Sequence, residues 1–302
     1  MVDFRTLIEL QGQIFLLVLA GVFFRRKLVG EEFQRDFSTL MVDLILPCNI
    51  LSSFKIELTR DMAGRTLQIF AISLAGQILA LVLGKILFKN MDPDRRAVMK
   101  YTLICSNASF LGIPVAGGIW GAEGVLLASV FLIPQRIVMW TVGLSWFSGG
   151  GGKGSVKKLF SNTCMIAVFL GLALMLTGLR LPGALRSAVE SISRCTTGMS
   201  MFMVGMMISH VHGRDFLDKD VILLTAVRLL LFPAALWLGC LLSRTDPLAA
   251  GAAAVLSAMP VGATVAVLAS RYHRAEEYAA DLVTVSTLIS LITIPLWGLL
   301  VT

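Results

Sequence analysis

The hydrophobic residues of this chain gather into long runs instead of alternating with polar residues. A helix needs about 20 apolar residues to cross the hydrocarbon core of a bilayer, and short polar segments separate ten runs of about that length. The runs are Thr6–Phe24, Phe37–Phe54, Thr66–Phe88, Val98–Ile119, Gly124–Phe147, Ser161–Leu179, Cys195–Val211, Val221–Leu242, Leu248–Ser270 and Tyr278–Val301. The pattern predicts an all-α membrane protein with ten transmembrane helices.

One segment between the runs has the composition of a linker. Ser148–Ser155 is rich in glycine, and Lys157 and Lys158 follow it. We therefore expect a first unit at residues 1–150, a linker at 151–160 and a second unit at 161–302, with five helices in each unit. Because five is odd, the second unit starts on the opposite side of the membrane from the first. The two units are then inverted repeats, an arrangement that many secondary transporters use.

The composition agrees with a membrane protein. Hydrophobic residues make up 56% of the chain, charged residues make up 15%, and the mean hydropathy is +0.82. Charged residues make up about 25% of an ordinary soluble domain. The net charge of +7 does not indicate nucleic acid as a partner, because the basic residues are scattered between the apolar runs.

The distribution of basic residues predicts the orientation in the membrane. The loops after the odd-numbered runs hold 15 Lys and Arg residues, and the segments on the other side hold eight. Loops rich in Lys and Arg stay in the cytoplasm. We therefore expect a multi-pass protein of the cell membrane whose linker is cytoplasmic and whose two termini are extracytoplasmic.

Two runs are too rich in glycine, proline and small polar residues for regular helices. The fourth contains Ser106-Asn107, Gly112 and Pro114, and the ninth contains Ser257–Thr264 around Pro260. Proline removes a backbone donor and clashes with the preceding turn, so both helices are expected to unwind near their prolines. A single proline would indicate only a kink. Paired breaks in two inverted halves indicate a binding site, and exposed helix N-termini favour anions.

The residues at these breaks resemble a known family. The fourth run is similar to the fourth-helix signature of the auxin efflux carrier family, which includes plant PIN-type carriers and bacterial malonate or malate carriers. The residues that carry this similarity are Ser106-Asn107, Gly112-Ile113-Pro114 and Trp120-Gly121. Three further segments agree in kind and order: Leu46-Pro47, Gln135 with Trp140, and Met259-Pro260 with Tyr272.

The resemblance implies a ten-helix inverted-repeat fold related to sodium/bile-acid symporters, with helices four and nine crossing at mid-membrane. Helices one, two, six and seven would form a scaffold, and helices three to five and eight to ten would form a transport unit that moves like an elevator. The resemblance also implies small organic anions as substrates. The ninth run lacks the Asn that plant members carry near the proline, so Ser257 and Thr264 are the available polar substitutes.

The candidate substrate site combines the two breaks with polar residues in neighbouring helices. Its members are Asn49, Asn107, Gly112, Ile113, Pro114, Val115, Gln135, Arg136, Ser257, Met259, Pro260, Val261 and Thr264. Asn107 would bind either the substrate or the freed backbone of the break. Arg136 would either attract the anion or form a structural pair with Glu123, Asp281 or a helix C-terminus. A charge in mid-membrane costs about 3 kcal/mol or more unless it is paired.

Two kinds of coupling are open. A sodium site like that of the related symporters would use polar groups around the crossing, for which the chain offers Asn107, Ser109, Ser257 and Thr264. Asp43, one turn before Pro47, would instead carry a proton, unless it pairs with a basic residue across the bundle. Arg228 in the eighth run is either part of such a site or a structural residue that binds carbonyls or snorkels. No metal cofactor is expected.

We therefore expect a secondary transporter for a small organic anion, a mono- or dicarboxylate, and not an enzyme. The alternatives are an intramembrane enzyme, a channel and a receptor. An enzyme of this kind would need a cluster of acidic metal ligands or an HExxH motif within a span, and the sequence holds neither. The expected partners are the substrate anion and the lipid bilayer, with no nucleic acid, and a homodimer stays open.

Overall fold

The computed structural model describes residues 4–54, 59–148, 163–179, 181–207, 209, 218–262 and 264–301. These residues form helices joined by short connections, without a strand, and one isolated bridge of extended backbone joins Ser106 to Val261. The linker expected at 151–160 lies outside the described residues.

The helices follow the expected runs, and several runs consist of two or three pieces. Before the linker the elements are α1 (Phe4–Lys27), α2 (Glu31–Leu40), η1 (Met41–Ile45), α3 (Leu46–Ser53), α4 (Arg60–Leu87), α5 (Pro93–Ile104), η2 (Ala108–Gly112), α6 (Ile113–Val138), η3 (Met139–Gly143) and α7 (Leu144–Ser148). After it they are α9 (Thr163–Thr177), α10 (Gly183–Ser193), α11 (Thr196–Met207), α12 (Lys219–Ala226), η6 (Val227–Leu231), α13 (Phe232–Leu242), α14 (Pro247–Ser257), α15 (Thr264–Arg271) and α16 (Glu276–Val301). Each η element is a single π turn.

Several helices have the length and surface of membrane spans. Among the described residues, four helical runs are long and apolar enough to cross a bilayer: Arg60–Leu87, Ala108–Phe147, Lys219–Leu242 and Glu276–Val301. The outer face of α4 is an apolar stripe of Leu67, Leu74, Ile78, Val82 and Ile86, all exposed. A helix at the surface of a soluble domain would turn such a stripe toward the core, so this surface suits a lipid environment.

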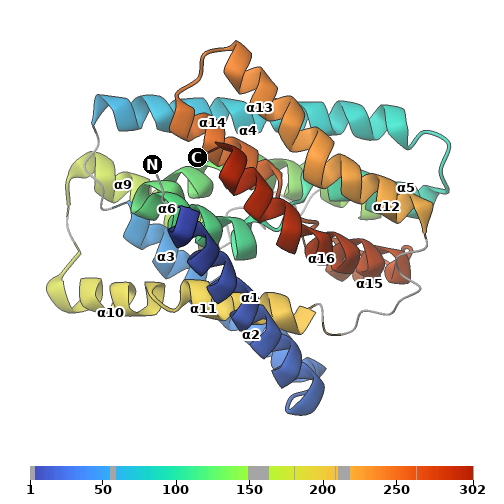
Figure 1. The fold of residues 1–302 in the computed structure, drawn as a ribbon, viewed down its shortest axis with the longest axis horizontal. Helices are drawn as coiled ribbons and strands as arrows, with labels where there is room; N and C mark the ends of the chain where they lie inside the picture. Colours follow the sequence, from blue (N-terminus) through green and yellow to red (C-terminus); the bar gives the residue numbers. More distant parts are fainter. Residues whose placement is uncertain are drawn as a thin grey trace.

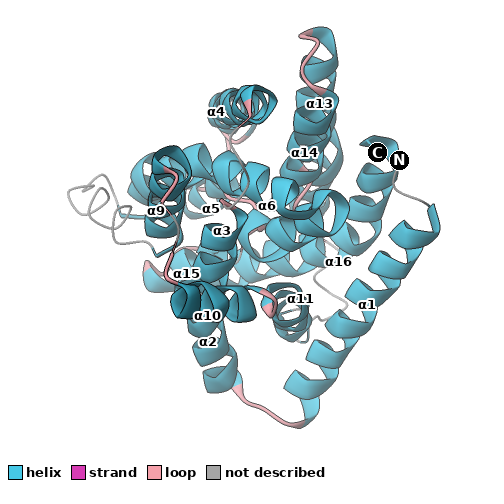
Figure 2. Cartoon of the chain, turned by 90° about the vertical axis from the view of Figure 1, so that its left-hand side faces the viewer, coloured by secondary structure: helices cyan, strands magenta, loops and turns pink. Residues whose placement is uncertain are grey.

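The helices form two sides of the molecule with the interrupted helices between them. In both views α1, α2, α10 and α11 gather on one side, and α4 and α13 lie on the opposite side, with α6, α14 and α16 between (Figures 1 and 2). The start of α1 lies beside the end of α16 (Figures 1 and 2). Within the first side, α1 and α11 pack backbone to backbone at Gly21. The absence of a side chain there allows this contact, since a Cβ would overlap the Phe202 carbonyl oxygen.

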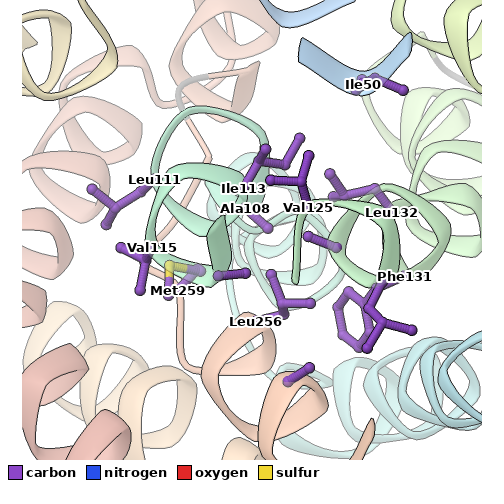
Figure 3. Packing of buried hydrophobic residues seen from close by; sticks show 14 of the residues in the cluster. Ile50, Ala108, Leu111, Ile113, Val115, Val125, Phe131, Leu132, Leu256 and Met259 are labelled. Carbon is purple, nitrogen blue, oxygen red and sulfur yellow. The ribbon is translucent and has the colours of Figure 1, made fainter. Parts of the chain in front are cut away.

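The middle of the molecule is densely packed by apolar side chains from the interrupted helices. Met259, just after α14, lies beside Val115 in the first turn of α6, and Leu256 is close by (Figure 3). Gly112 allows this approach, since a Cβ there would lie 3.0 Å from Leu256 Cδ2 and 3.2 Å from Met259 Cγ. The whole of α14 from Ala249 to Ser257 is buried.

Proline does not break the fourth run, contrary to the prediction for Pro114. Pro114 lies in the first turn of α6, which continues the π turn η2 without interruption. Before this proline, Ile113 donates its N–H to the carbonyl five residues back, that of Ala108. A regular α-helix would place the carbonyl of the fourth preceding residue against the proline ring, and the extra residue of the π turn shifts it.

The same π turn precedes two other prolines. Pro47 follows η1 and Pro233 follows η6, and in both cases the residue before the proline donates its N–H to the carbonyl five residues back. At three prolines, therefore, a preceding π turn lets the helix continue. The true interruption of the fourth run lies earlier, at Cys105–Asn107, between α5 and η2.

Candidate functional site

The two interrupted helices meet where their extended segments pair. The N–H of Asn107 donates to the carbonyl of Pro260 at 2.7 Å, and the N–H of Gly262 donates to the carbonyl of Cys105 at 3.0 Å. These bonds form an antiparallel bridge between Ser106 and Val261. Backbone groups that leave a helix need new partners when they are buried, and here each break supplies partners for the other.

The backbones approach so closely at this crossing that a side chain would not fit. A Cβ on Gly262 would lie 2.8 Å from Cys105 Sγ and 3.2 Å from the Ser106 carbonyl oxygen. Neighbouring positions carry buried apolar side chains, among them Met259 and Val261. The crossing is thus a narrow contact between two peptide segments.

Gln135 in α6 holds the first break from the side. Its Nε2 donates to the Ser106 carbonyl at 3.0 Å, and the Ser106 hydroxyl donates to its Oε1 at 2.7 Å. Gln135 is buried, with 3% of its surface exposed. The side chain therefore satisfies one donor and one acceptor of Ser106, and it fixes the extended conformation that pairs with Val261.

Asn107 offers a side-chain donor at the same place. Its backbone is fully used, because its carbonyl accepts from Leu111 N at 3.0 Å and its N–H is bonded to Pro260. The side chain is 2% exposed, and its Nδ2 has no hydrogen-bond partner within the described part of the chain. A buried amide without a partner costs about 1–3 kcal/mol. This group is therefore free to bind a ligand at the crossing.

Two buried arginines lie next to the first break. Arg136 Nη2 donates to Ser109 Oγ at 3.3 Å, and Arg228 Nη1 donates to the Leu103 carbonyl at 2.9 Å. Arg228 also lies over the ring of Phe232 at 5.3 Å. Among the side chains that the structure describes, these arginines are the charged residues in the buried core, and no Asp or Glu is buried with them.

Glu123, one of the proposed partners of Arg136, is engaged elsewhere. Its Oε1 accepts from Arg65 Nη1 at 2.7 Å, and Arg65 Nε is 3.1 Å from Asp246 Oδ2. Asp246 also caps the first turn of α14. Two residues before Glu123, the backbone of α6 leaves the helical conformation at Gly121, where φ is 61°. The ionic cluster joins α4, this turn in α6 and α14. Its members lie far apart in the chain, so no local sequence pattern predicts it.

The polar groups at the second break bond its own helix and neighbouring segments, and the side chains around it are mostly apolar. The Val261 N–H donates to Ser286 Oγ of α16 at 3.1 Å. Ser257 Oγ donates to the Ala254 carbonyl of its own helix at 2.9 Å, and Thr264 begins α15. Ile113 and Val115 are buried at the start of α6.

Asn49 and Asp43 lie away from this crossing. Asn49 Nδ2 donates to Ser193 Oγ at 3.1 Å, at the end of α10. Asp43 is exposed, and its Oδ1 accepts from Thr163 Oγ1 of α9 at 3.0 Å. These contacts place both residues in the packing of α3 and η1 against α9 and α10.

A buried polar stripe in α16 was missed. Ser286 and Thr287 are adjacent, Ser290 and Thr293 follow at intervals of three residues, and all four are buried in a largely apolar helix. This spacing places them on one helix face, and Ser286 bonds the second break. The pattern was visible in the sequence and would have indicated a helix that faces the crossing.

The resulting site suits a small anion. The helices that follow the breaks, η2 and α15, begin at Ala108 and Thr264. The positive ends of both helices therefore lie beside the bridged segments. Two guanidinium groups and the Asn107 amide add charge and a donor. Preorganised donors in a dry site bind anions well.

Comparison with known proteins places the chain among transporters. The sequence model of a family described as "Membrane transport protein" matches residues 7–163 and 152–298. An uncharacterized transporter of Methanocaldococcus jannaschii is 25% identical over 300 residues, which cover 94% of this chain and 96% of the relative. An uncharacterized transporter of Methanothermobacter thermautotrophicus is 24% identical over 306 residues, covering 94% and 95%. The uncharacterized transporter YfdV of Escherichia coli is 24% identical over 299 residues, covering 94% of each chain.

Proposed function

The chain belongs to the membrane transport protein family, the auxin efflux carrier family that its motifs resemble, and on that premise we propose that it carries a small organic anion across the cell membrane. The substrate class is a mono- or dicarboxylate. The carrier is a secondary transporter, and the anion binds at the crossing of the two interrupted helices.

The observation that carries this proposal is the sign of the buried charge. Arg136 and Arg228 lie within hydrogen-bond distance of the residues that flank the first break, and no described Asp or Glu is buried beside them in the core. A charge in the interior of a membrane protein is expensive and marks a substrate path or a binding partner. An anion would bind beside the Arg228 guanidinium, whose Nε has no hydrogen-bond partner among the described residues.

The Asn107 side chain offers a donor that would orient the anion in the proposed site. Its Nδ2 is buried and has no hydrogen-bond partner in the described part of the chain, and it belongs to the residue that bridges the two breaks. A carboxylate at this place would accept from Nδ2 and from the first N–H groups of η2. Charge-assisted bonds of this kind are the strong ones in a dry site.

We further propose ten spans in two inverted halves, with both termini extracytoplasmic. Three observations support this arrangement. The two interruptions pair with each other, α5 and α14 both begin with an Asp cap followed by proline, and the start of α1 lies beside the end of α16. Ends on the same side require an even number of spans.

An elevator movement is the proposed mechanism. The helices of the proposed scaffold pack on one another, α1 on α11 and α3 on α9 and α10. The helices of the proposed transport unit do the same, α4 on α6 and α13 on α14. The contact of α11 with η2 lies between these two groups. Sliding at this interface would carry the crossing from one side of the membrane to the other.

Ligand-induced stabilisation and flux test the proposal. Purified protein would be melted with mono- and dicarboxylates, and the matched neutral amides would serve as controls. A ligand at 100 times its Kd stabilises the folded state by about 2.7 kcal/mol, so at least one carboxylate should raise Tm and enter proteoliposomes, whereas its amide should do neither. An intact helical protein that responds to no carboxylate and transports none would sink the proposal.

A further inference from the structure

Arg228 occupies the carbonyl end of the interrupted helix α5. The residue enters from η6, is 3% exposed, and donates from Nη1 to the Leu103 carbonyl at 2.9 Å. Leu103 is the second-last residue of α5. The last four carbonyls of a helix lack partners within the helix, and together they carry a partial negative charge of about half an electron. The guanidinium therefore lies where a mobile cation would be attracted.

We infer that Arg228 is a built-in cation of the substrate site, which takes the place of a co-transported sodium ion at the first break. Carbonyls at broken helix ends are the groups with which many secondary transporters bind their coupling ion. Here a tethered guanidinium neutralises that end permanently. The inference rests on the proposed function, since it says how the charge of the anion is balanced during transport.

Four of the carbonyl groups around the break already have protein donors. The Leu103 carbonyl accepts from Arg228, and the Cys105 carbonyl accepts from Gly262 N–H. The Ser106 carbonyl accepts from Gln135 Nε2 at 3.0 Å, and the Asn107 carbonyl accepts from Leu111 N at 3.0 Å. A sodium ion would have to displace these donors, the guanidinium among them.

The guanidinium also keeps capacity for an anion. The helix end neutralises about half of its charge. Its Nε has no hydrogen-bond partner among the described residues, and its Cζ lies over the face of the Phe232 ring, 5.3 Å from the centroid. No buried carboxylate is found in the described core. Arg228 thus adds positive charge to the site on which a carboxylate depends.

At the end of the second interrupted helix, the described hydrogen bonds come from other donors. Near the end of α14, the Ala254 carbonyl accepts from the Ser257 hydroxyl and from Ala258 N, and the described contacts place no guanidinium there. One tethered cation therefore serves the pair of breaks, on the side of α5.

The first experiment replaces sodium. The wild-type protein is melted and assayed for carboxylate uptake in sodium chloride and in choline chloride of equal concentration. We expect the same Tm, the same carboxylate-induced shift and the same initial rate in both salts. A rate that falls tenfold or more in choline would overturn the inference.

The second experiment removes the cation and adds it back. Arg228→Ala should lower Tm and weaken carboxylate binding by about tenfold to a hundredfold, which is the value of one hydrogen bond to a charged group. Millimolar methylguanidinium should restore part of both. The control Arg186→Ala removes an exposed arginine paired with Glu190 and should respond to neither change. Arg228→Lys keeps the charge and should fold if the alanine variant does not.

The outcomes separate this inference from the proposed function. If no carboxylate affects the wild type, the proposed function fails, while recovery of the Tm of Arg228→Ala by methylguanidinium would still support the cation at the end of α5. If carboxylates bind and Arg228→Ala binds them as tightly as the wild type, the inference fails and the proposed function stands.

Discussion

The two interrupted helices differ in how they satisfy the backbone N–H and carbonyl groups that leave the helix at each break. The first break, Cys105–Asn107, is short and polar, and Gln135 and the second break supply its partners. Arg228 bonds the Leu103 carbonyl just before it.

The second break, described over residues 258–262, contains Pro260 and buried apolar residues. Besides its bonds to the first break, it donates the Val261 N–H to the Ser286 hydroxyl. The first break thus lies beside the donors and charges of the proposed ligand site. The second provides a narrow surface against which the first is held.

This difference predicts that changes at the first break cost the most. Gln135→Leu removes two hydrogen bonds and leaves the Ser106 carbonyl and hydroxyl buried without partners. Each buried unsatisfied group costs about 1–3 kcal/mol, so we expect a loss of about 3 kcal/mol in thermal unfolding and a strong loss of flux. Gln135→Glu keeps the acceptor for the Ser106 hydroxyl, so its stability should lie between those of the wild type and Gln135→Leu. A melting temperature of Gln135→Leu equal to that of the wild type would show that the Gln135 side chain does not stabilise the first break.

The close approach of the two breaks gives the next effect. Gly262→Ala would bring a Cβ to 2.8 Å from Cys105 Sγ, and overpacking of this kind costs about 1–3 kcal/mol. The matched control is Gly239→Ala in α13, where a Cβ meets nothing within 4 Å. Thermal unfolding of both variants checks the prediction. Equal stability of the two would show that the breaks do not touch as described.

The smallest effect is expected at the second break. Ser286→Ala removes the acceptor of one N–H, that of Val261, and should cost about 1 kcal/mol. The control Ser290→Ala removes a hydroxyl that bonds the Thr287 carbonyl of its own helix, and its effect should be smaller. A loss at Ser286 as large as that at Gln135 would reverse the ranking of the two breaks.

The fold was more predictable from the sequence than the site. Apolar runs fixed the helices because membrane spans need length and apolar surface. The prediction that the helix unwinds at Pro114 was wrong, because a π turn before this proline lets the helix continue. The break at Ser106 depends instead on Gln135 and on the second break, which are distant in the chain. Local sequence does not reveal such partners.

The same limit applies to the polar residues. Asn49 and Asn107 both looked like ligand residues, and the structure separates them, because Asn49 Nδ2 bonds Ser193 at the end of α10. The partner of Arg228 is a backbone carbonyl, which every residue has and no sequence pattern marks. The stripe in α16 was predictable, since its four polar residues share one helix face.

The central claim, that an anion binds at the first break, is tested most directly by carboxylate binding to Asn107→Leu beside Asn49→Leu. Leucine has nearly the shape of asparagine and removes the unpartnered Nδ2, so the Asn107 variant should keep its melting temperature. We predict that it loses carboxylate affinity by about tenfold to a hundredfold, whereas the Asn49 variant keeps the wild-type affinity. Unchanged affinity in a folded Asn107→Leu protein would contradict the account.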